Sequence, residues 1–208
     1  MRTVFFYMKF RIWETALLVL VAGFLLFGSV AQATAEGLSG DFLRLHVIAN
    51  SDSAYDQELK LLVRDEILAY SEEILVPGLG LAACETVLME RLDELEGLAA
   101  QVLRENGCEL AVAASLTDAH FPTKHYGGFS LPAGNYRALR IVIGEGGGEN
   151  WWCVVFPPLC FGAVTETVTA EQAMAYGVDA RNAGLIAGEN EGYVLRFKCL
   201  EIWDSLVN

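Results

Sequence analysis

Two apolar runs joined by a glycine-rich turn fill residues 134–161 and constrain the fold more than any other stretch. In the first run, residues 134–143, apolar side chains recur at every second position, which is the pattern of a β-strand. The second run, residues 151–156, is apolar on both faces, as in a central strand, and Pro157 ends it because proline cannot donate to a sheet ladder. The turn GEGGGEN at 144–150 is rich in glycines that tolerate positive φ. The sequence therefore predicts a β-hairpin at the centre of a sheet.

Hydrophobic periodicity elsewhere predicts both further strands and helices. The first long helix follows Asn50-Ser51-Asp52-Ser53, side chains that are typical of helix caps, and its apolar residues recur at spacings of three and four. Strands are expected at 42–49, 109–116 and 193–200, long helices at 53–75 and 81–105, short helices at 170–176 and 179–187, and a loop at 117–128. This order predicts an α+β fold, with a largely antiparallel sheet and two main helices packed on one face.

The N-terminus has the three parts of an export signal. Three basic residues accompany an apolar segment at 15–27, and the small-residue sequences AQA at 31–33 and ATA at 33–35 each fit a cleavage site. The sequence therefore predicts a signal peptide at 1–33, followed by a single extracytoplasmic α+β domain at 34–208.

An uncleaved N-terminal membrane anchor is the alternative interpretation of residues 1–33. The apolar stretch that ends at residue 31 has 17 residues, which is the lower limit for crossing a bilayer. In that case the chain would contact the membrane only through this segment. With either interpretation, the body is expected outside the cytoplasm of the cell that makes it.

The charge of the chain excludes some classes of partner. The whole chain has 14 basic against 27 acidic residues, and without residues 1–33 the count is 11 against 26, a net charge of about −15. Such a body repels phosphate backbones and anionic lipid surfaces. Nucleic acid is therefore not expected as a partner.

No motif in the chain predicts a cofactor or a metal. GEGGGEN lacks the lysine and serine spacing of a phosphate loop, and an expected strand follows it rather than a helix. The five cysteines include no Cys-x-x-Cys pair, which argues against a structural zinc site. Cys153 and Cys160 flank Pro157-Pro158, and export makes a disulfide between them chemically feasible. Two buried thiols are the alternative, and the sequence leaves this choice open.

A cysteine-dependent hydrolase is the enzymatic alternative. It would need a thiol beside a basic histidine, with Cys153 or Cys160 as the nucleophile. The base would come from the three histidines of the chain, His46, His120 and His125. Both cysteines lie in apolar sequence, which raises a thiol pKa and makes the thiol unreactive. Since no other catalytic motif is present, a non-enzymatic binding protein is expected.

Three segments carry a resemblance to a known family. LRLHVIANSDSAYDQELKLLVRDEIL, FPTKHYGGFSLPAGNYRALRIVIGEG and NWWCVVFPPLC resemble stage II sporulation protein R of endospore-forming bacteria, over about residues 42–161. The resemblance implies a signalling protein that is made in the forespore and exported into the space between the forespore and mother-cell membranes. Its implied partner is a membrane-embedded aspartic protease of the mother cell, which cleaves the precursor of a mother-cell sigma factor.

Side chains suited to binding such a partner are scarce in this acidic chain, and arginine, tyrosine and tryptophan dominate protein interfaces. The candidate partner-binding residues are Arg44, His46, Lys124, Tyr126, Arg140 and Trp151. Arg140 is preferred to Arg137, because the alternation places Arg137 on the same face as the apolar Leu139 and Ile141. For the two adjacent tryptophans, burial in the core is the alternative.

Overall fold

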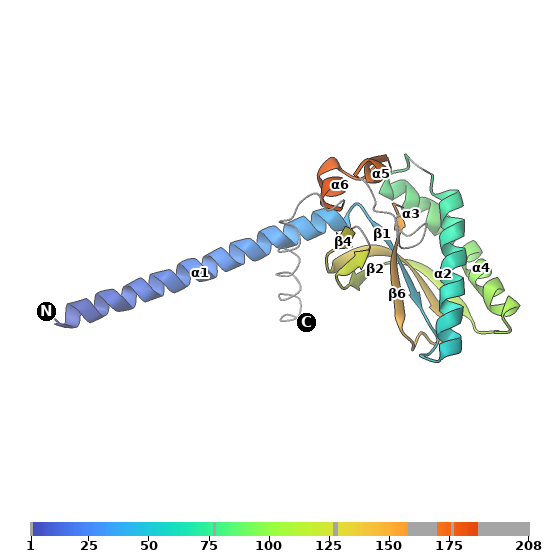
Figure 1. Cartoon of the computed structure of the whole chain (residues 1–208), viewed down its shortest axis with the longest axis horizontal. Coiled ribbons are helices and arrows are strands. Elements are labelled where there is room, and N and C mark those ends of the chain that lie inside the picture. Colours follow the sequence, from blue (N-terminus) through green and yellow to red (C-terminus); the bar gives the residue numbers. More distant parts are fainter. Residues whose placement is uncertain (1, 77, 127–128, 158–169, 176, 187–208) are drawn as a thin grey trace.

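The structure, a computed structural model, describes residues 2–76, 78–126, 129–157, 170–175 and 177–186 of the chain (Figure 1). The helices are α1 (Arg2–Ser39), α2 (Ala54–Ile74), α3 (Leu81–Glu90), α4 (Leu92–Glu105), α5 (Ala170–Ala175) and α6 (Ala180–Ile186). The strands are β1 (Leu43–Ile48), β2 (Val112–Phe121), β3 (Lys124–Tyr126), β4 (Phe129–Leu131), β5 (Gly134–Ile143) and β6 (Asn150–Phe156). These elements confirm the predicted α+β class.

The larger sheet has the strand order β2-β5-β1-β6. β1 pairs in parallel with β5 and antiparallel with β6, and β2 pairs antiparallel with β5 along its whole length. β5 and β6 are therefore not neighbours, and the predicted hairpin between them is wrong. β6 is also the last strand of the described sheet rather than a central one. The apolar pattern identified both strands, by alternation in residues 134–143 and as a continuous run in residues 151–156, but it carries no information about which strand each one pairs with.

A glycine-rich loop carries the chain from β5 to β6 across the end of β1. Because β1 separates these strands, the loop must span two strand spacings, roughly 10 Å. The N–H groups of Gly147 and Gly148 donate to the carbonyl oxygens of Asn50 and Ala49 at 3.1 and 2.9 Å. Gly144 has a φ of 57°, which favours glycine. The stretch predicted as a hairpin turn is thus a crossover loop that packs on the segment after β1.

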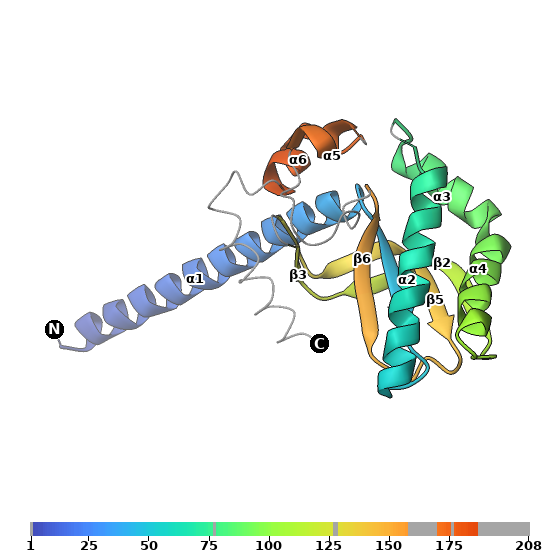
Figure 2. The same ribbon diagram turned by 45° about the vertical axis from the view of Figure 1, so that its right-hand side comes forward.

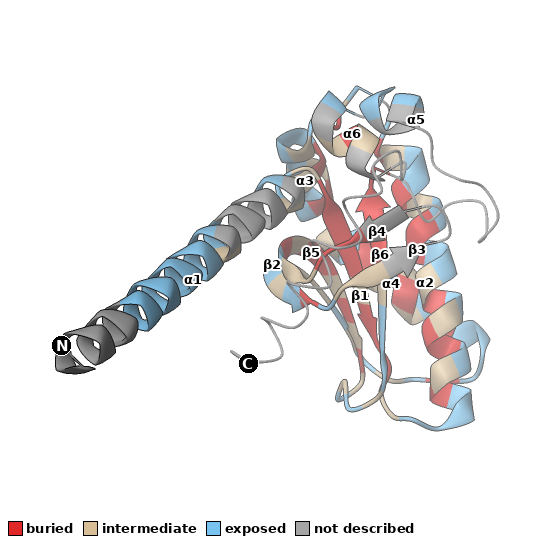
Figure 3. Cartoon of the chain, turned by 60° about the vertical axis from the view of Figure 1, so that its left-hand side comes forward, coloured by how far each residue is buried: buried red, intermediate tan, exposed pale blue. Residues whose placement is uncertain are grey.

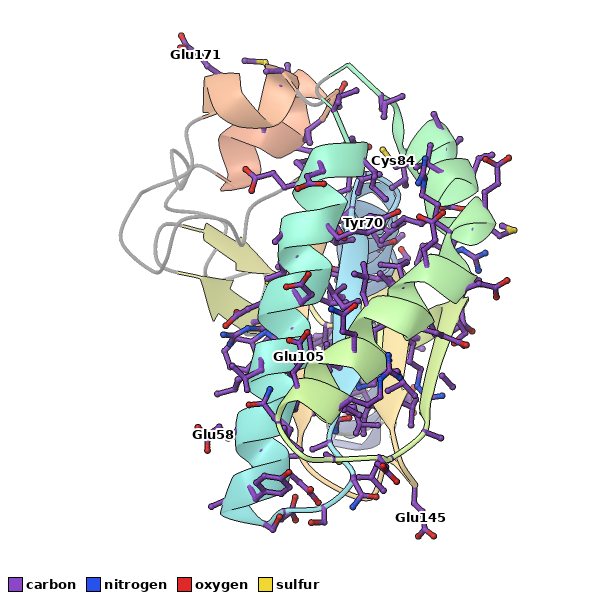
Figure 4. The ribbon with its side chains drawn as sticks, turned by 90° about the vertical axis from the view of Figure 1, so that its right-hand side faces the viewer. Glu58, Tyr70, Cys84, Glu105, Glu145 and Glu171 are labelled. Carbon is purple, nitrogen blue, oxygen red and sulfur yellow. The ribbon has the colours of Figure 1, made fainter. Side chains whose placement is uncertain are left out.

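The core lies between the larger sheet and the helices α2, α3 and α4 (Figure 2). Figure 4 looks onto these helices, with the sheet behind them. Sheet residues of the core include Leu43, Leu45, Val47, Leu139, Ile141, Ile143, Cys153 and Val155, and helix residues include Leu59, Val63, Ile67, Cys84, Leu88, Leu95, Ala99 and Leu103. The helix predicted at 81–105 is two helices, because the chain turns at Arg91. No glycine or proline marks that turn, so the periodicity did not indicate it.

α1 projects away from the sheet, and its side chains at 12–26 are exposed (Figures 1 and 3). α1 contacts the body at β5, and at its end the Asn182 side-chain amide of α6 donates to the Gly37 carbonyl oxygen at 3.5 Å and to the carboxylate of Asp41, just after the helix, at 2.6 Å. Within the described part of the chain, no helix combines the length and apolar character needed to cross a bilayer. Cleavage or retention of residues 1–33 stays a prediction.

The second predicted strand is longer than expected, and the loop predicted at 117–128 is wrong. β2 continues to Phe121, which pairs with Gly134 of β5, and β3 and β4 then form a small hairpin. Polar residues such as Asp118 and His120 favoured a loop in the sequence pattern, but β2 accommodates them because both are exposed. The short predicted helices are confirmed as α5 and α6. The strand predicted at 193–200 lies outside the described residues.

Candidate functional site

Four side chains line up across the larger sheet, on the face opposite α2, α3 and α4. Since Leu45 and Val47 face the helices, His46 between them faces the other side. The strand register places Arg140 of β5 beside His46, Ser115 of β2 beside Arg140, and Trp152 of β6 on the far side of His46. All four are partly exposed, and we call Ser115, Arg140, His46 and Trp152 the His46 row. The row unites two of the predicted binding residues, His46 and Arg140.

His46 is held in one orientation by its neighbours. Its Nε2 lies 2.7 Å from Asn150 Oδ1, and its ring lies 5.8 Å from the Phe121 ring and 6.0 Å from the Trp152 ring, measured between centroids. Burial lowers the pKa of His46 below its ordinary 6.5; the Asn150 bond acts in the opposite direction, and the nearby Arg140 lowers it further. His46 is therefore a neutral imidazole at neutral pH that donates from Nε2 to Asn150. Its buried Nδ1 has no hydrogen-bond partner among the described residues.

Lys124 adds a second cation to the His46 row. Its Nζ lies 4.7 Å from the centre of a Trp152 ring, which is within the range of cation–π attraction. Lys124 is the first residue of β3, so the small hairpin brings it to the row. Together with Arg140 it concentrates positive charge beside an indole, on a chain whose net charge is −13. This combination can bind the acidic and aromatic groups of a protein partner.

Arg44 is completely buried, so its prediction as a surface contact is wrong. Its Nε donates to the carbonyl oxygen of Cys153 at 3.0 Å. Its guanidinium carbon lies 4.3 Å from the Phe121 ring centre and 4.9 Å from the Tyr136 ring centre. Alternation placed Arg44 on the face opposite the helices, but it did not indicate that this part of the face is covered.

Trp151 lies on the other side of β6 from the His46 row. Its ring stands 4.4 Å from the guanidinium carbon of Arg64 on α2, and 36% of the residue is exposed. Trp152, not Trp151, therefore belongs with His46 and Arg140. Alternation shows that adjacent strand residues face opposite sides, but the sequence does not say which of them faces the helices.

The candidate residue Tyr126 pairs through its backbone with Phe129 in the small hairpin, and the Tyr126 side chain lies outside the described atoms.

A polar junction joins the β1–α2 loop to the crossover loop. The Asp56 carboxylate accepts hydrogen bonds from Ser51 Oγ at 2.5 Å and from Asn50 Nδ2 at 2.9 Å, and these bonds hold the pKa of Asp56 below its ordinary value. Across the junction, Asp52 Oδ1 accepts from the backbone N–H of Glu149 at 2.7 Å. The motif NSDS therefore has a structural role, since its side chains hold the start of α2 and the crossover loop together.

The cysteines do not form the site of a hydrolase within the described part of the chain. Cys84 and Cys108 are free and buried, and burial raises the pKa of the Cys84 thiol to about 11. Cys153 is disulfide-bonded, so it offers no thiol as a nucleophile. Its partner lies outside the described residues, as does Cys160, and the pairing of Cys153 with Cys160 stays a prediction.

Metal-binding groups are likewise not gathered in the described residues. No cluster of three or more histidine, cysteine, aspartate and glutamate side chains is placed there to hold an ion. What the described residues do bring together is a cationic and aromatic row on one face of the sheet. Such a row can bind a partner. It does not place a nucleophile and a base within hydrogen-bond distance of each other, as catalysis by a hydrolase would require.

Comparison with known proteins gives the family. The family model described as stage II sporulation protein R matches residues 39–166, more than half of the chain. Stage II sporulation protein R of Bacillus subtilis (strain 168) is 38% identical over 123 residues, which cover 57% of this chain. The match covers 53% of that relative, so it spans about half of the relative's length. No solved structure matches the chain. The chain belongs to the stage II sporulation protein R family.

Proposed function

We propose that this chain is an exported signal that passes from the forespore to the mother cell. Membership of the stage II sporulation protein R family supports a role in sporulation. In this proposal the chain lies between the forespore and mother-cell membranes and activates a membrane-embedded aspartic protease. The protease then processes the precursor of a mother-cell sigma factor. The chain itself acts by binding and not by catalysis.

The observation that carries a binding role is the His46 row with Lys124. Arg140, Lys124 and Trp152 belong to residue types that can anchor protein interfaces, and they lie on one face of an otherwise acidic body. Trp152 is partly buried and packs against His46 and Lys124, so its position is partly set before binding. A fixed contact side chain loses little conformational entropy on binding, which favours the complex.

Activation requires that the chain bind the active state of the protease more tightly than the inactive state. A tenfold shift between the two states corresponds to about 1.4 kcal/mol of differential binding free energy. One interface hot spot supplies roughly 2 kcal/mol or more, so the His46 row is large enough to supply the differential binding free energy for a tenfold shift. Because aspartic proteases need two carboxylates in one site, joining two protease chains is one route to activation.

The test is Arg140→Ala, compared with Arg104→Ala as the matched control. Both changes remove one arginine, but Arg104 is exposed on α4, on the helix side of the molecule. We expect both variants to reach normal abundance outside the producing cell, as surface substitutions usually do. Arg140→Ala should reduce cleavage of the sigma-factor precursor, and Arg104→Ala should not.

A third variant separates loss of contact from loss of folding. Ile141, next to Arg140, is buried in the core, so Ile141→Ala should cost about 2–5 kcal/mol and deplete the protein. The measurements are exported protein, by immunoblot, and precursor cleavage in cells that contain the protease. Normal cleavage by Arg140→Ala at normal abundance would show that the His46 row is not the contact.

A further inference from the structure

The outer edge of β2 is a row of backbone groups that no described strand covers. β2 pairs only with β5 in the larger sheet, and it is ten residues long. In an antiparallel strand, the backbone groups of successive residues point to opposite sides. The Ala111 carbonyl accepts from Gly144 on the β5 side, whereas the Ala114 N–H donates outward to Glu96 Oε1 at 2.7 Å. The backbone groups of Leu116 and Asp118 therefore also point outward.

Glu96 covers the Ala114 N–H, but no described strand covers the next two outward residues, Leu116 and Asp118. Within the described part of the chain, no group accepts a hydrogen bond from the N–H of Leu116 or Asp118. Native proteins usually protect an edge of this length with lysine, proline or a bulge. β2 reads VAASLTDAHF, which contains neither lysine nor proline, and its register with β5 runs without a shift. The edge is thus available for pairing with another strand.

Three carboxylates border this edge on the side of the helices. The Asp118 side chain is 77% exposed and lies 3.6 Å from Arg137, whose other partner is Glu85 on α3 at 3.4 Å. Glu96 borders the same edge through its bond to Ala114. On the helix side of β2 these three carboxylates outnumber Arg137, so this side of the edge attracts positive charge. A second copy of this chain, with a net charge of −13, is repelled.

We propose that the edge of β2 binds an extended, basic segment of a partner protein as an added strand. The segment hydrogen-bonds to the outward N–H and C=O groups of Leu116 and Asp118, and these bonds supply affinity without regard to sequence. Every second side chain of the segment lies on the same face as Asp118, and lysine or arginine there supplies specificity. Ser115 of β2 belongs to the His46 row, but the proposed strand uses the outward backbone groups of Leu116 and Asp118 and the opposite face of β2, so its failure would leave the proposed function intact.

The test uses two synthetic peptides, one of alternating lysine and valine and one of alternating glutamate and valine. We expect the purified full-length chain to bind the lysine peptide and not the glutamate peptide. Amide exchange, followed residue by residue by NMR, should slow at Leu116 and Asp118 when the lysine peptide binds. It should change little at Ser115 and Thr117, whose N–H groups already face β5.

Asp118→Lys should weaken binding of the lysine peptide about tenfold and permit binding of the glutamate peptide, because it reverses the charge at the edge. Glu58→Lys is the matched control, since it makes the same change of net charge on α2, where Glu58 points away from the body (Figure 4). Equal weakening by both variants would overturn the proposal, because binding would then follow net charge alone. Binding of the lysine peptide without slowed exchange at Leu116 and Asp118 would also overturn it, as would binding of neither peptide.

Discussion

Gly148 packs so closely against Ser51 that a Cβ atom added to it would stand 2.6 Å from the Ser51 carbonyl carbon. On the other side of the same loop, a Cβ on Gly144 would stand 2.9 Å from Asn50 Cγ. The crossover loop thus contacts the backbone of the β1–α2 loop at Gly148 and the Asn50 side chain at Gly144, and neither position has room for a further side chain. This contact explains why the connection from β5 to β6 is so rich in glycine.

Gly148→Ala should destabilise the fold by roughly 1–3 kcal/mol, because the backbone of Ser51 must move to admit the methyl group. Urea unfolding followed by circular dichroism measures the change. Gly97→Ala is the matched control, since Gly97 is exposed within α4 and a Cβ there meets no atom within 4 Å. It should stabilise the chain by about 0.5–1 kcal/mol through helix propensity. If the two variants change stability alike, the close contact at Gly148 is not real.

Local features of the fold were predictable because each corresponds to a pattern of neighbouring residues in the sequence. The alternation at 134–143 placed Leu139 and Ile141 in the core, and the structure confirms both. Ser53 was predicted as a helix cap, and its Oγ accepts from the Asp56 N–H at 3.1 Å. Each of these follows from residues adjacent in the chain.

Pairing between strands was not predictable, because it depends on residues far apart in the chain. β1 separates β5 from β6, and nothing in GEGGGEN distinguishes a crossover loop from a hairpin turn. The composition of the candidate site also depends on strand pairing, so the sequence predicted only part of it. His46 and Arg140 were among the candidate residues and lie side by side in the sheet, but the choice between Trp151 and Trp152 required the register of β6. Arg44 has the sequence pattern of an exposed residue and is buried by tertiary packing.

Stability should fall as the pH decreases below about 6.5, through His46. Burial lowers the pKa of His46; the Asn150 hydrogen bond partly opposes this lowering, and the nearby Arg140 adds to it. Below pH 6.5 the unfolded chain therefore binds a proton that the folded chain does not yet bind, so acid favours unfolding. The free energy of unfolding, measured in urea at pH 7.5 and 5.5, should be lower at pH 5.5.

His46→Gln provides the control for this pH dependence, because glutamine does not titrate. The variant should lose a large part of the difference between pH 7.5 and 5.5, because it removes the group whose pKa burial lowers. An unchanged difference in His46→Gln would mean that other groups cause the acid sensitivity.

The cysteines should divide into two chemical classes. Cys153 is disulfide-bonded, whereas Cys84 and Cys108 are free and buried. Iodoacetamide should therefore modify Cys84 and Cys108 only after denaturation, since a buried neutral thiol is unreactive. Peptide mapping by mass spectrometry without reduction should recover Cys153 linked to Cys160. A linkage of Cys153 to Cys199 would contradict the predicted pairing but not the disulfide itself.

Arg44→Ala should deplete the protein rather than impair binding alone. The guanidinium of Arg44 lies against the rings of both Phe121 and Tyr136 and donates to the Cys153 carbonyl. Truncation removes these contacts and leaves a buried cavity, so we expect a loss of roughly 2–4 kcal/mol. Arg44→Lys should also destabilise the fold, because an ammonium group cannot reproduce the stacking of a planar guanidinium. Exported abundance and urea unfolding give the measurement, with Arg140→Ala as the comparison. If Arg44→Ala reaches normal abundance and stability but fails to activate the protease, Arg44 is a contact residue and its burial in the free chain is not maintained in the complex.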